Sequence, residues 1–472
     1  MTPKNSNKNL NSRSETAEKV RLSAIQDKAV ELNFNGGEMS SDAGLLQLRE
    51  IETQIHLLRD MAQLLNDERD QRYVQHSVED LLLQRVMQIA AGYEDGNDCQ
   101  TLRHDPVFKM LAQRQPESDP PLASQPTMSR FENSIRRTTL LRLAYLLAEK
   151  FVASYEEEPT LIVIDADDTE DTVYGGQQEA LFNNYYKNHC YLPLHIYEGL
   201  SGKLITTILK PGKRATGHQM LGIVKRLVKY LRQAWPNTII VFRGDSHFAY
   251  DEVMSWCEAQ ENVHYVLGLT GNAVLLEKTK PLLDRALNKY HTQRTQAREM
   301  AVPVDTIQVR LYHSIYYRAQ SWQQHRRVIM KVEVTPDGRN IRYIITDLRQ
   351  AAAQRLYEQV YCGRGQMELY IKEHKLYLKS DRTSCTRFEA NQFRLFLHSA
   401  AYILIHAFRT NVLQHTEWAN ASIQTLRLRL LKIGARIREL KTCIKVELPT
   451  SFPLQMIIRR SFQLFAALPP TG

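Results

Sequence analysis

Three aspartates in two short apolar segments could bind divalent metal ions. Asp165 and Asp167 lie in the run LIVIDADDT, and Asp245 follows the run IIVF after one arginine and one glycine. Both runs have the composition of β-strands. Alternation along a strand would place Asp165 and Asp167 on the same face of a sheet. For any one of these residues, a capping or turn aspartate at a strand end is the structural alternative.

A second group of residues has the spacing of one helical face. The segment YCGRGQMELYIKEHK contains Tyr361, Arg364, Glu368 and Lys375, which are three, four and seven residues apart. On a helix this spacing puts all four side chains in one stripe, with Lys372 beside them. The stripe could be a ladder of surface ion pairs, or it could supply a third carboxylate to the two strand ends.

The elements that must position the aspartates have the order of an RNase H-like core. Three strands in hairpin connection are predicted, followed by a helix, a strand, a helix and a strand. Their sequences are LIVIDADDT, YLPLHIYEG, GKLITTILKPG, GHQMLGIVKRLVKYLRQAW, NTIIVFRGDSHF, AYDEVMSWCEAQ and VHYVLGLTG. This order predicts an α/β fold with a mixed sheet. The β-type runs that follow, up to residue 348, delay the final helix of the core and indicate a β-rich insertion.

The composition is that of a soluble globular protein with a polyanionic partner. The chain has 472 residues, 43% hydrophobic and 24% charged, and a net charge of +9. Its length suggests about three domains. Residues 401–472 contain ten Lys and Arg against three Asp and Glu. A basic excess of this kind points to nucleic acid, although a solvated basic surface is equally compatible with it.

The cysteines and the apolar segments exclude several other classes. The six cysteines form no CxxC pair and no zinc-site spacing with histidine, so neither a disulfide framework nor a structural metal is indicated. The polar N-terminus has no apolar core of a signal peptide, and the run RLFLHSAAYILIHAF is too short to span a bilayer. We therefore expect a cytoplasmic protein with no membrane partner.

Longer stretches of the chain resemble a known family. The Tyr361, Arg364, Glu368 and Lys375 pattern resembles the Tyr-Arg-Glu-Lys signature of DDE transposases from bacterial insertion sequences that carry a β-strand insertion. The segments SSDAGLLQLREIE, HSVEDLLLQRVMQIAAGYEDGND, PLASQPTMSRFEN, GGQQEALFNNYYKNHCYLPLHIYEG and RGDSHFA resemble the IS-thirteen-eighty family among them. The resemblance runs from about residue 30 to residue 465.

This resemblance implies an acid triad that binds two divalent ions. Carried onto this chain, the triad is Asp167, or its neighbour Asp165, then Asp245 and Glu368. Asp167 is preferred because Asp167-Asp168-Thr169 resembles the usual Asp-Gly/Ala-Thr form, with Asp168 in place of the small residue. The list of catalytic candidates is Asp167, Asp245, Glu368, Asp165, Lys375, Arg364 and Tyr361. Arg364 and Lys375 would hold the terminal phosphate, with Tyr361 beside it.

The resemblance also implies the reaction and its partners. Mg2+, with Mn2+ as a substitute, would support cleavage of DNA at the inverted-repeat ends of an insertion sequence and strand transfer into target DNA. The end-paired complex would be at least a homodimer, in a bacterial cytoplasm and associated with the nucleoid. Two alternatives remain: another RNase H-like DNA nuclease or resolvase, and a catalytically silent, domesticated DNA-binding protein.

The predicted domains follow from both lines of reasoning. They are a flexible tail (1–28), an N-terminal helical DNA-binding domain (29–155), the first part of an RNase H-like core (156–289), the β-rich insertion (290–348), the final core helix with the catalytic Glu (349–400) and a basic C-terminal helical region (401–472). The predicted DNA contacts are Arg364, Lys375, Lys372, Trp322, Arg326, Arg327, Arg130, Arg427 and Arg429. For Trp322 two roles are open, stacking on an extruded base or filling the core of the insertion.

Overall fold

The computed structural model describes residues 20–301 and 303–467, and its centre is a mixed sheet of eight strands. The strand order is β12-β13-β14-β11-β10-β4-β8-β9. The strands of the predicted core are β4 (Leu161–Asp168), β8 (Leu194–Glu198), β9 (Leu204–Ile208), β10 (Ile239–Gly244) and β11 (Val263–Leu269). β10 is parallel to both β4 and β11, whereas β8 is antiparallel to β4 and to β9. The predicted α/β class with a mixed sheet is confirmed.

The two faces of this sheet bury different residues because side chains alternate along each strand. On β4, Ile162, Ile164 and Ala166 pack in one core with the helices α8 (Gly217–Ala234), α9 (Asp251–Glu258) and α10 (Ala273–Glu299). Val163 belongs to a second core on the opposite face, together with Leu356 and Tyr357. Asp165 and Asp167, two and four residues after Val163, therefore lie on that opposite face.

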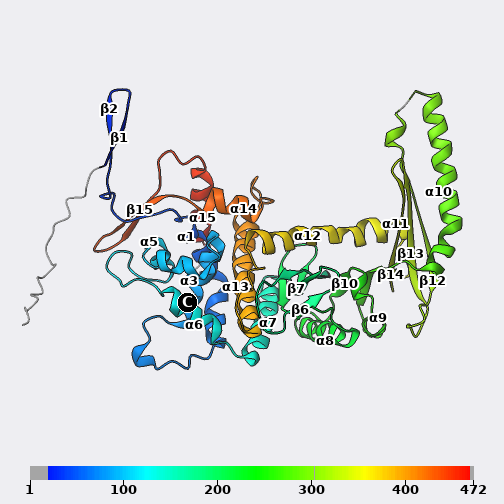
Figure 1. Cartoon of the computed structure of the whole chain (residues 1–472), viewed down its shortest axis with the longest axis horizontal. Helices are drawn as coiled ribbons and strands as arrows, with labels where there is room; N and C mark the ends of the chain where they lie inside the picture. Colours follow the sequence, from blue (N-terminus) through cyan, green and yellow to red (C-terminus); the bar gives the residue numbers. More distant parts are fainter. Residues whose placement is uncertain (1–19, 302, 468–472) are drawn as a thin grey trace, which may run out of the picture.

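The predicted insertion continues the central sheet. Its strands β12 (Val309–Tyr317), β13 (Arg326–Thr335) and β14 (Gly338–Thr346) form an antiparallel meander, and β14 pairs with β11. The 27-residue helix α10 packs on β12 and β13, and the group projects from one end of the molecule (Figure 1). The insertion therefore shares its core with the rest of the sheet.

One long helical segment crosses the second face of the sheet. It begins with α11 (Ala353–Arg355), a π-helical stretch Leu356–Tyr361 and a short turn Cys362–Arg364. It continues through α12 (Gly365–Lys372) and a second π-helical stretch, Glu373–Tyr377. In Figure 1 this yellow rod runs from the insertion to the helical body at the other end of the molecule. The predicted Tyr-Arg-Glu-Lys stripe lies along it.

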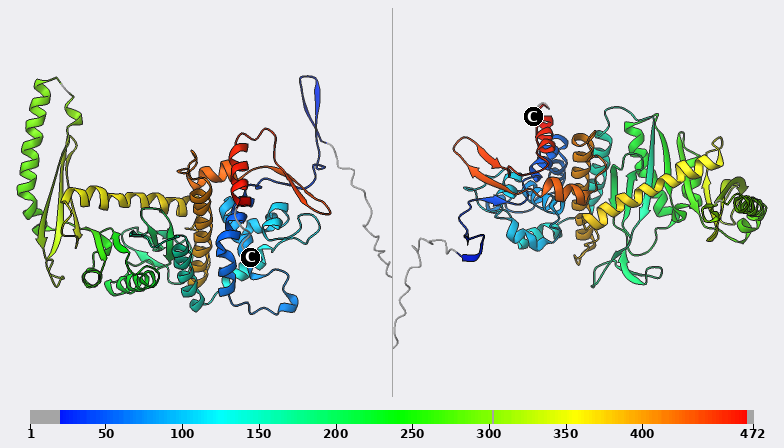
Figure 2. Two further views of the ribbon diagram at one scale, coloured as in Figure 1. Left: turned by 180° about the vertical axis from the view of Figure 1, so that it is seen from behind. Right: turned by 90° about the horizontal axis from the view of Figure 1, so that it is seen from above.

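The helical body combines both ends of the chain around one core (Figure 2). Its N-terminal helices are α1 (Leu45–Ile55), α2 (Leu57–Leu64), α3 (Val78–Ala91), α4 (Cys99–Leu102), α5 (Pro106–Leu111), α6 (Gln125–Asn133) and α7 (Arg137–Ala153). The buried helix α13 (Phe388–Ala407) packs against α3 and β9, so it joins this body to the central sheet. The short helix α14 (Ile423–Leu426) and helix α15 (Gln455–Ala467) complete it.

The C-terminal region is less helical than predicted. β15 (Ala435–Glu439) and β16 (Ile444–Glu447) form a small sheet with β3 (Met39–Ser40), so the prediction of a helical 401–472 is wrong for these residues. β1 (Val20–Ile25) and β2 (Lys28–Leu32) form a hairpin whose first strand lies within residues 1–28, the segment predicted to be a flexible tail. The remainder of that tail, residues 1–19, and residues 468–472 lie outside the described residues.

A third small sheet joins the end of β4 to the long helix. It contains β5 (Asp171–Thr172), β7 (Asn188–Tyr191) and β6 (Leu181–Asn183) in that order. The sequence analysis did not predict it. Within the described residues, no helix is long and apolar enough to cross a membrane.

Candidate active site

Asp165 and Arg243 form a buried ion pair at the centre of the face that carries the long helix. The pairing of β4 with β10 places the two residues directly opposite each other. Arg243 Nε lies 2.5 Å from Asp165 Oδ1, and Nη2 lies 2.6 Å from Oδ2. Arg243 also donates to the carbonyl oxygen of Val360 in the long helix. Burial raises the pKa of Asp165, and the charge of Arg243 opposes that rise.

Two glycines make room for this pair. A Cβ atom on Gly199 would lie 2.3 Å from Asp165 Oδ2, and one on Gly363 would lie 2.8 Å from Arg243 Nη1. Any side chain at either position would displace the pair. The close approach of Arg243 therefore explains why glycine, a weak helix former, occupies position 363 at the start of the Tyr-Arg-Glu-Lys stripe.

Asp167 is two residues further along the same face, and its partner comes from the long helix. Arg364 Nη2 lies 2.7 Å from Asp167 Oδ2. Burial raises the pKa of Asp167 to about 7; the charge of Arg364 lowers it, and the charges of Asp245 and Asp168 raise it further. Asp168 itself is paired with Lys210 at 2.6 Å. Asp167 is therefore a carboxylate whose charge the surrounding protein compensates only in part.

Asp245 follows the end of β10, the strand next to β4. Its carboxylate accepts a hydrogen bond of 2.8 Å from the backbone N–H of His247 and caps a short helical turn. A Cβ atom on Gly268 would lie 2.7 Å from the hydroxyl of Tyr361 and 3.1 Å from the carbonyl carbon of Asp245. Gly268 thus lets Tyr361 approach the Asp245 turn.

The long helix carries two glutamates near this site, and they differ in environment. Glu373 is buried and paired with Arg409 at 3.1 Å, and it also accepts a hydrogen bond from the backbone of Ile423. Glu368 is exposed, and in the part of the chain that the structure describes its carboxylate makes no hydrogen bond or ion pair. It lies one helical turn after Arg364, on the face that Arg364 presents to Asp167. Lys372, one turn further, is also exposed.

Lys375 is held by the segment that follows Asp167. Its ammonium group donates to the carbonyl oxygen of Glu170 and to the hydroxyl of Thr169, the latter at 3.3 Å. Asp171 Oδ1 lies 3.9 Å from it. Lys375 is therefore engaged with its own chain, in contrast to the exposed Lys372.

The structure thus brings together Asp167, Asp245, Arg364 and Tyr361, with Glu368 one turn away. In residues 20–301 and 303–467, no three His, Cys, Asp or Glu side chains are gathered closely enough to hold a metal ion. The sequence analysis missed Arg243 as the partner of Asp165. Strand alternation could have found it, because Arg243 occupies the position on β10 that matches Asp165 on β4.

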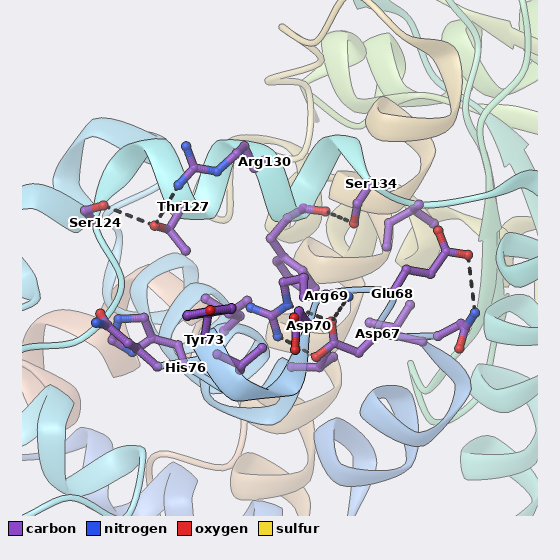
Figure 3. A pocket seen from close by; sticks show the side chains of 18 of the residues that line it. Asp67, Glu68, Arg69, Asp70, Tyr73, His76, Ser124, Thr127, Arg130 and Ser134 are labelled. Atoms are coloured by element: carbon purple, nitrogen blue, oxygen red, sulfur yellow. Dashed lines mark hydrogen bonds and ion pairs between the residues drawn. The ribbon is translucent and has the colours of Figure 1, made fainter.

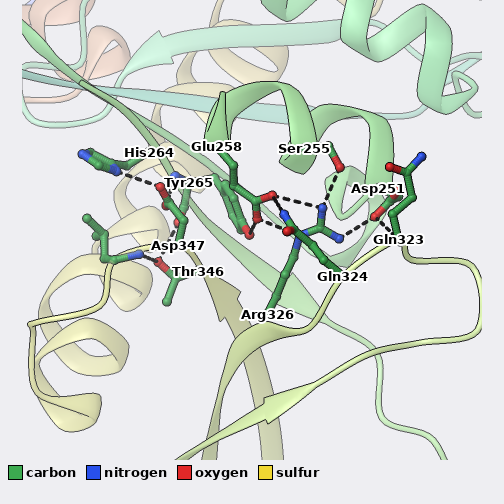
Figure 4. A network of polar contacts seen from close by, with 11 residues as sticks. Asp251, Ser255, Glu258, His264, Tyr265, Gln323, Gln324, Arg326, Thr346 and Asp347 are labelled. Carbon is green, nitrogen blue, oxygen red and sulfur yellow. Dashed lines mark hydrogen bonds and ion pairs between the residues drawn. The ribbon is translucent and has the colours of Figure 1, made fainter. Parts of the chain in front are cut away.

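The predicted DNA contacts in the insertion have partners inside the protein, and Figure 4 shows those of Arg326. Trp322 is 7% exposed and packs edge to face against Tyr317 in the main core. Arg326 is buried and forms ion pairs with Asp251 at 2.5 Å and Glu258 at 2.7 Å, both on α9. A DNA-contact role for Trp322 and Arg326 does not fit this burial. The core role, the alternative for Trp322, matches its position.

The second arginine predicted to contact DNA in the insertion, Arg327, also has partners inside the protein. Arg327 donates to the backbone carbonyl oxygens of Leu348, Arg349 and Ala351. It therefore fixes the chain between β14 and the long helix. Together with Arg326, it attaches the insertion to the core on both sides of β13.

Of the two DNA contacts predicted near α14, one arginine is buried and the other is exposed. Arg427 is buried and donates to the carbonyl oxygens of Ala90 and Tyr377, and burial lowers its pKa to about 10. In this arrangement Arg427 cannot contact a phosphate, because its buried side chain links α3 to the end of the long helix. Arg429, two residues later, is exposed.

Arg130 lies on α6 beside a cavity of about 650 Å3 (Figure 3). The cavity is bounded by the loop that contains Asp67, Arg69 and Tyr73 and by the start of α6. Arg130 is exposed, and among the described residues its side chain has one hydrogen-bond partner, the hydroxyl of Thr127 at 3.3 Å. Arg130 and Arg429 are therefore free to meet a ligand.

Comparison with known proteins gives the family. No curated protein matches the chain by sequence. Among solved structures, the cryo-EM structure of the piggyBac transposase synaptic complex with hairpin DNA is similar over 83% of this chain and 80% of that chain, with 12% sequence identity and a TM-score of 0.43. The family model described as "Transposase DDE domain group 1" matches residues 22–470. The chain therefore belongs to the DDE transposases, in the group that this model describes.

Proposed function

We propose that this chain is a DNA transposase that binds the inverted-repeat ends of an insertion sequence, cleaves them and joins them to target DNA. The observation that carries the proposal is the meeting of Asp167 and Asp245 at neighbouring strand ends, under a helix that contributes Arg364 and Glu368. The bacterial IS-thirteen-eighty family remains the assignment that the sequence motifs favour.

The proposed catalytic core is RNase H-like. Its support is the order β9-β8-β4-β10-β11, in which three antiparallel strands are followed by two parallel ones. The long helix after the insertion supplies the last acid. In this scheme the insertion interrupts the core between β11 and that helix.

Asp167, Asp245 and Glu368 are the proposed ligands of two Mg2+ ions, which Mn2+ could replace. The donor set fits such ions, since carboxylate oxygens are the ligands that hard cations prefer. The partly compensated charge of Asp167 fits as well, because its neighbours Asp245 and Asp168 oppose its ionisation and a cation would favour it. Bound ions of this type activate water or a 3′-hydroxyl group and stabilise the leaving oxygen of a phosphodiester.

In this proposal Asp165 stabilises the fold and is not a metal ligand. Its two oxygens are occupied by Arg243 in a buried pair, so Asp167 is the better first ligand. Arg364 pairs with Asp167 in the free protein and would turn to the terminal phosphate of the DNA. Tyr361 lies beside it, next to the Asp245 turn.

Double-stranded DNA is the proposed partner, as transposon ends and as target, with a homodimer in the end-paired complex. Arg130 and Arg429 are the exposed cations among the contacts predicted in the helical body. A location in the bacterial cytoplasm, at the nucleoid, would follow from this partner.

The test is cleavage of a supercoiled plasmid that carries the element's two ends, in Mg2+. A transposase nicks at the ends and yields joined products. A nuclease or resolvase of the same fold would cut without regard to the ends, or at branched DNA. A silent DNA-binding protein would protect the ends without cutting, and either of these last two results would contradict the proposal.

A further inference from the structure

The ammonium group of Lys375 has three neighbours, and all belong to the segment that directly follows Asp167 and Asp168. These neighbours are the carbonyl oxygen of Glu170, the hydroxyl of Thr169 and the carboxylate of Asp171. An ammonium group has three hydrogens to donate. Lys375 uses two of these hydrogens in its bonds to Glu170 and Thr169, and its contact with Asp171 at 3.9 Å is an ion pair, so a DNA phosphate would compete with Asp171 for the charge of Lys375.

Asp171 is the unusual member of this group. Its side chain is 1% exposed, and within residues 20–301 and 303–467 neither carboxylate oxygen has a hydrogen-bond partner. Burial raises its pKa well above the ordinary range of an aspartate; the charge of Lys375 opposes the rise, while Asp381 and Glu170 add to it. A buried carboxylate without hydrogen bonds is costly unless a cation stands beside it. Lys375 is the cation that has this position.

The backbone fixes Asp171 in its place. Asp171 and Thr172 form β5, which pairs with β7 through Asp171 and Tyr191. The backbone N–H of Thr169 donates to the carbonyl oxygen of Pro193. The backbone of Asp171 is thus fixed in a strand that faces the long helix. The longer side chain of Lys375 is the partner that can move away from this ion pair.

We propose that Asp171 is a positioning residue that holds Lys375 against the segment after Asp167 in the free protein and competes with the DNA phosphate for it. The inference rests on the proposed function, in which Lys375 contacts the terminal phosphate. When Lys375 turns to DNA, Asp171 stays buried beside Asp381 and Glu170 without a cation, and it takes up a proton. Binding of transposon ends therefore becomes weaker as pH rises, and removal of the Asp171 charge strengthens it.

The experiment measures the affinity for end DNA in protein that carries Asp167→Asn. This background is expected to be inert in cleavage, and it removes the carboxyl group of Asp167, whose raised pKa of about 7 would add a pH dependence of its own. In this background, Asp171→Asn should bind end DNA about tenfold more tightly at pH 8, because a charged competitor for Lys375 is gone. The matched control is Glu170→Gln, whose side chain accepts from Thr172 and not from Lys375, and which should bind within about twofold of the background.

The dependence on Lys375 separates competition from a general change of charge. In a protein that also carries Lys375→Gln, Asp171→Asn should no longer strengthen binding. An equal gain with and without Lys375, or unchanged or weaker binding by Asp171→Asn, overturns the proposal.

A measurement without substitution of Asp171 keeps the test decisive if Asp171→Asn does not fold. Proton uptake on end binding, measured calorimetrically in two buffers of different ionisation enthalpy, should be detectable with Lys375 in place and fall after Lys375→Gln. Equal uptake by the two proteins contradicts the competition. Failure of the proposed function would appear elsewhere, as absent end-specific cleavage by the unmodified protein.

Discussion

Arg243 lies opposite Asp165 across strands β10 and β4, and both oxygens of the aspartate bond to the guanidinium group, at 2.5 and 2.6 Å. The next residue on the same face, Asp167, has its partner on the helix that follows the insertion. Asp165 is thus paired inside the sheet, whereas Asp167 is paired with the long helix.

This division predicts different consequences for the two aspartates. Asp165→Asn should lower the free energy of unfolding by about 3 to 5 kcal/mol, because it leaves the buried Arg243 without a countercharge. Asp167→Asn should not destabilise the protein at neutral pH. Urea denaturation of the two variants at pH 7.5 measures both effects, and equal losses of stability would contradict the assignment.

The raised pKa of Asp167 predicts a pH dependence of stability in metal-free protein. In the folded state Asp167 keeps its proton up to a pH of about 7, whereas in the unfolded state it releases the proton near pH 4. Asp167 therefore favours folding most below pH 4. That contribution is lost as pH rises from 4 to 7. Asp167→Asn should therefore gain stability relative to the unmodified protein over this range, by at most about 4 kcal/mol at about 1.4 kcal/mol per pH unit. Parallel unfolding curves from pH 4 to 8 would contradict the shift.

The exposed cations of the C-terminal region are predicted to follow DNA phosphates. Joint neutralisation of Arg429, Arg436 and Lys445 should reduce the slope of log affinity against log salt by up to about 2.7 units, at about 0.9 per contact. Arg427→Gln is the matched control, because this buried arginine should affect stability and leave the slope unchanged. An unchanged slope for the triple variant would mean that these cations are only solvated.

Trp322 is predicted to act through packing. Trp322→Ala should cost about 3 to 5 kcal/mol of stability, as expected for a large buried side chain. Tyr316→Ala, at an aromatic residue of β12 that is 63% exposed, should cost little. A stable Trp322→Ala protein that binds ends and stalls after the first nick, with rescue by an abasic substrate, would support base stacking in place of a core role.

The strands of the core were predictable because their apolar runs are short, alternating and bounded by turn residues. The helix that carries Tyr361, Arg364 and Glu368 was predictable from its spacing, but its π-helical and 3-10 stretches were not. Local patterns of this kind do not reveal which distant element a strand joins. The pairing of β14 with β11, which merges the insertion with the central sheet, depends on tertiary contact.

The misassigned residues have a similar cause. The Arg- and Leu-rich residues before Lys432 are helical, but β15, which follows them, pairs with β3 from the N-terminal part of the chain. In the sequence, Arg427 and Arg326 cannot be told apart from surface cations. In the structure both are buried, because Arg427 donates to a backbone carbonyl oxygen and Arg326 pairs with a carboxylate, each from a distant element. A basic residue in a sequence does not say whether its partner is DNA or the protein itself.

The central claim is that Asp167, Asp245 and Glu368 act together on DNA. Its most direct test is cleavage of end-bearing DNA in Mg2+ by Asp167→Asn, Asp245→Asn and Glu368→Gln, with end affinity measured in parallel. Each variant should lose cleavage by at least about a thousandfold and keep its affinity for the ends, since residues that act as one unit fail individually. Cleavage that persists at the unmodified rate in any one of the three would contradict the claim.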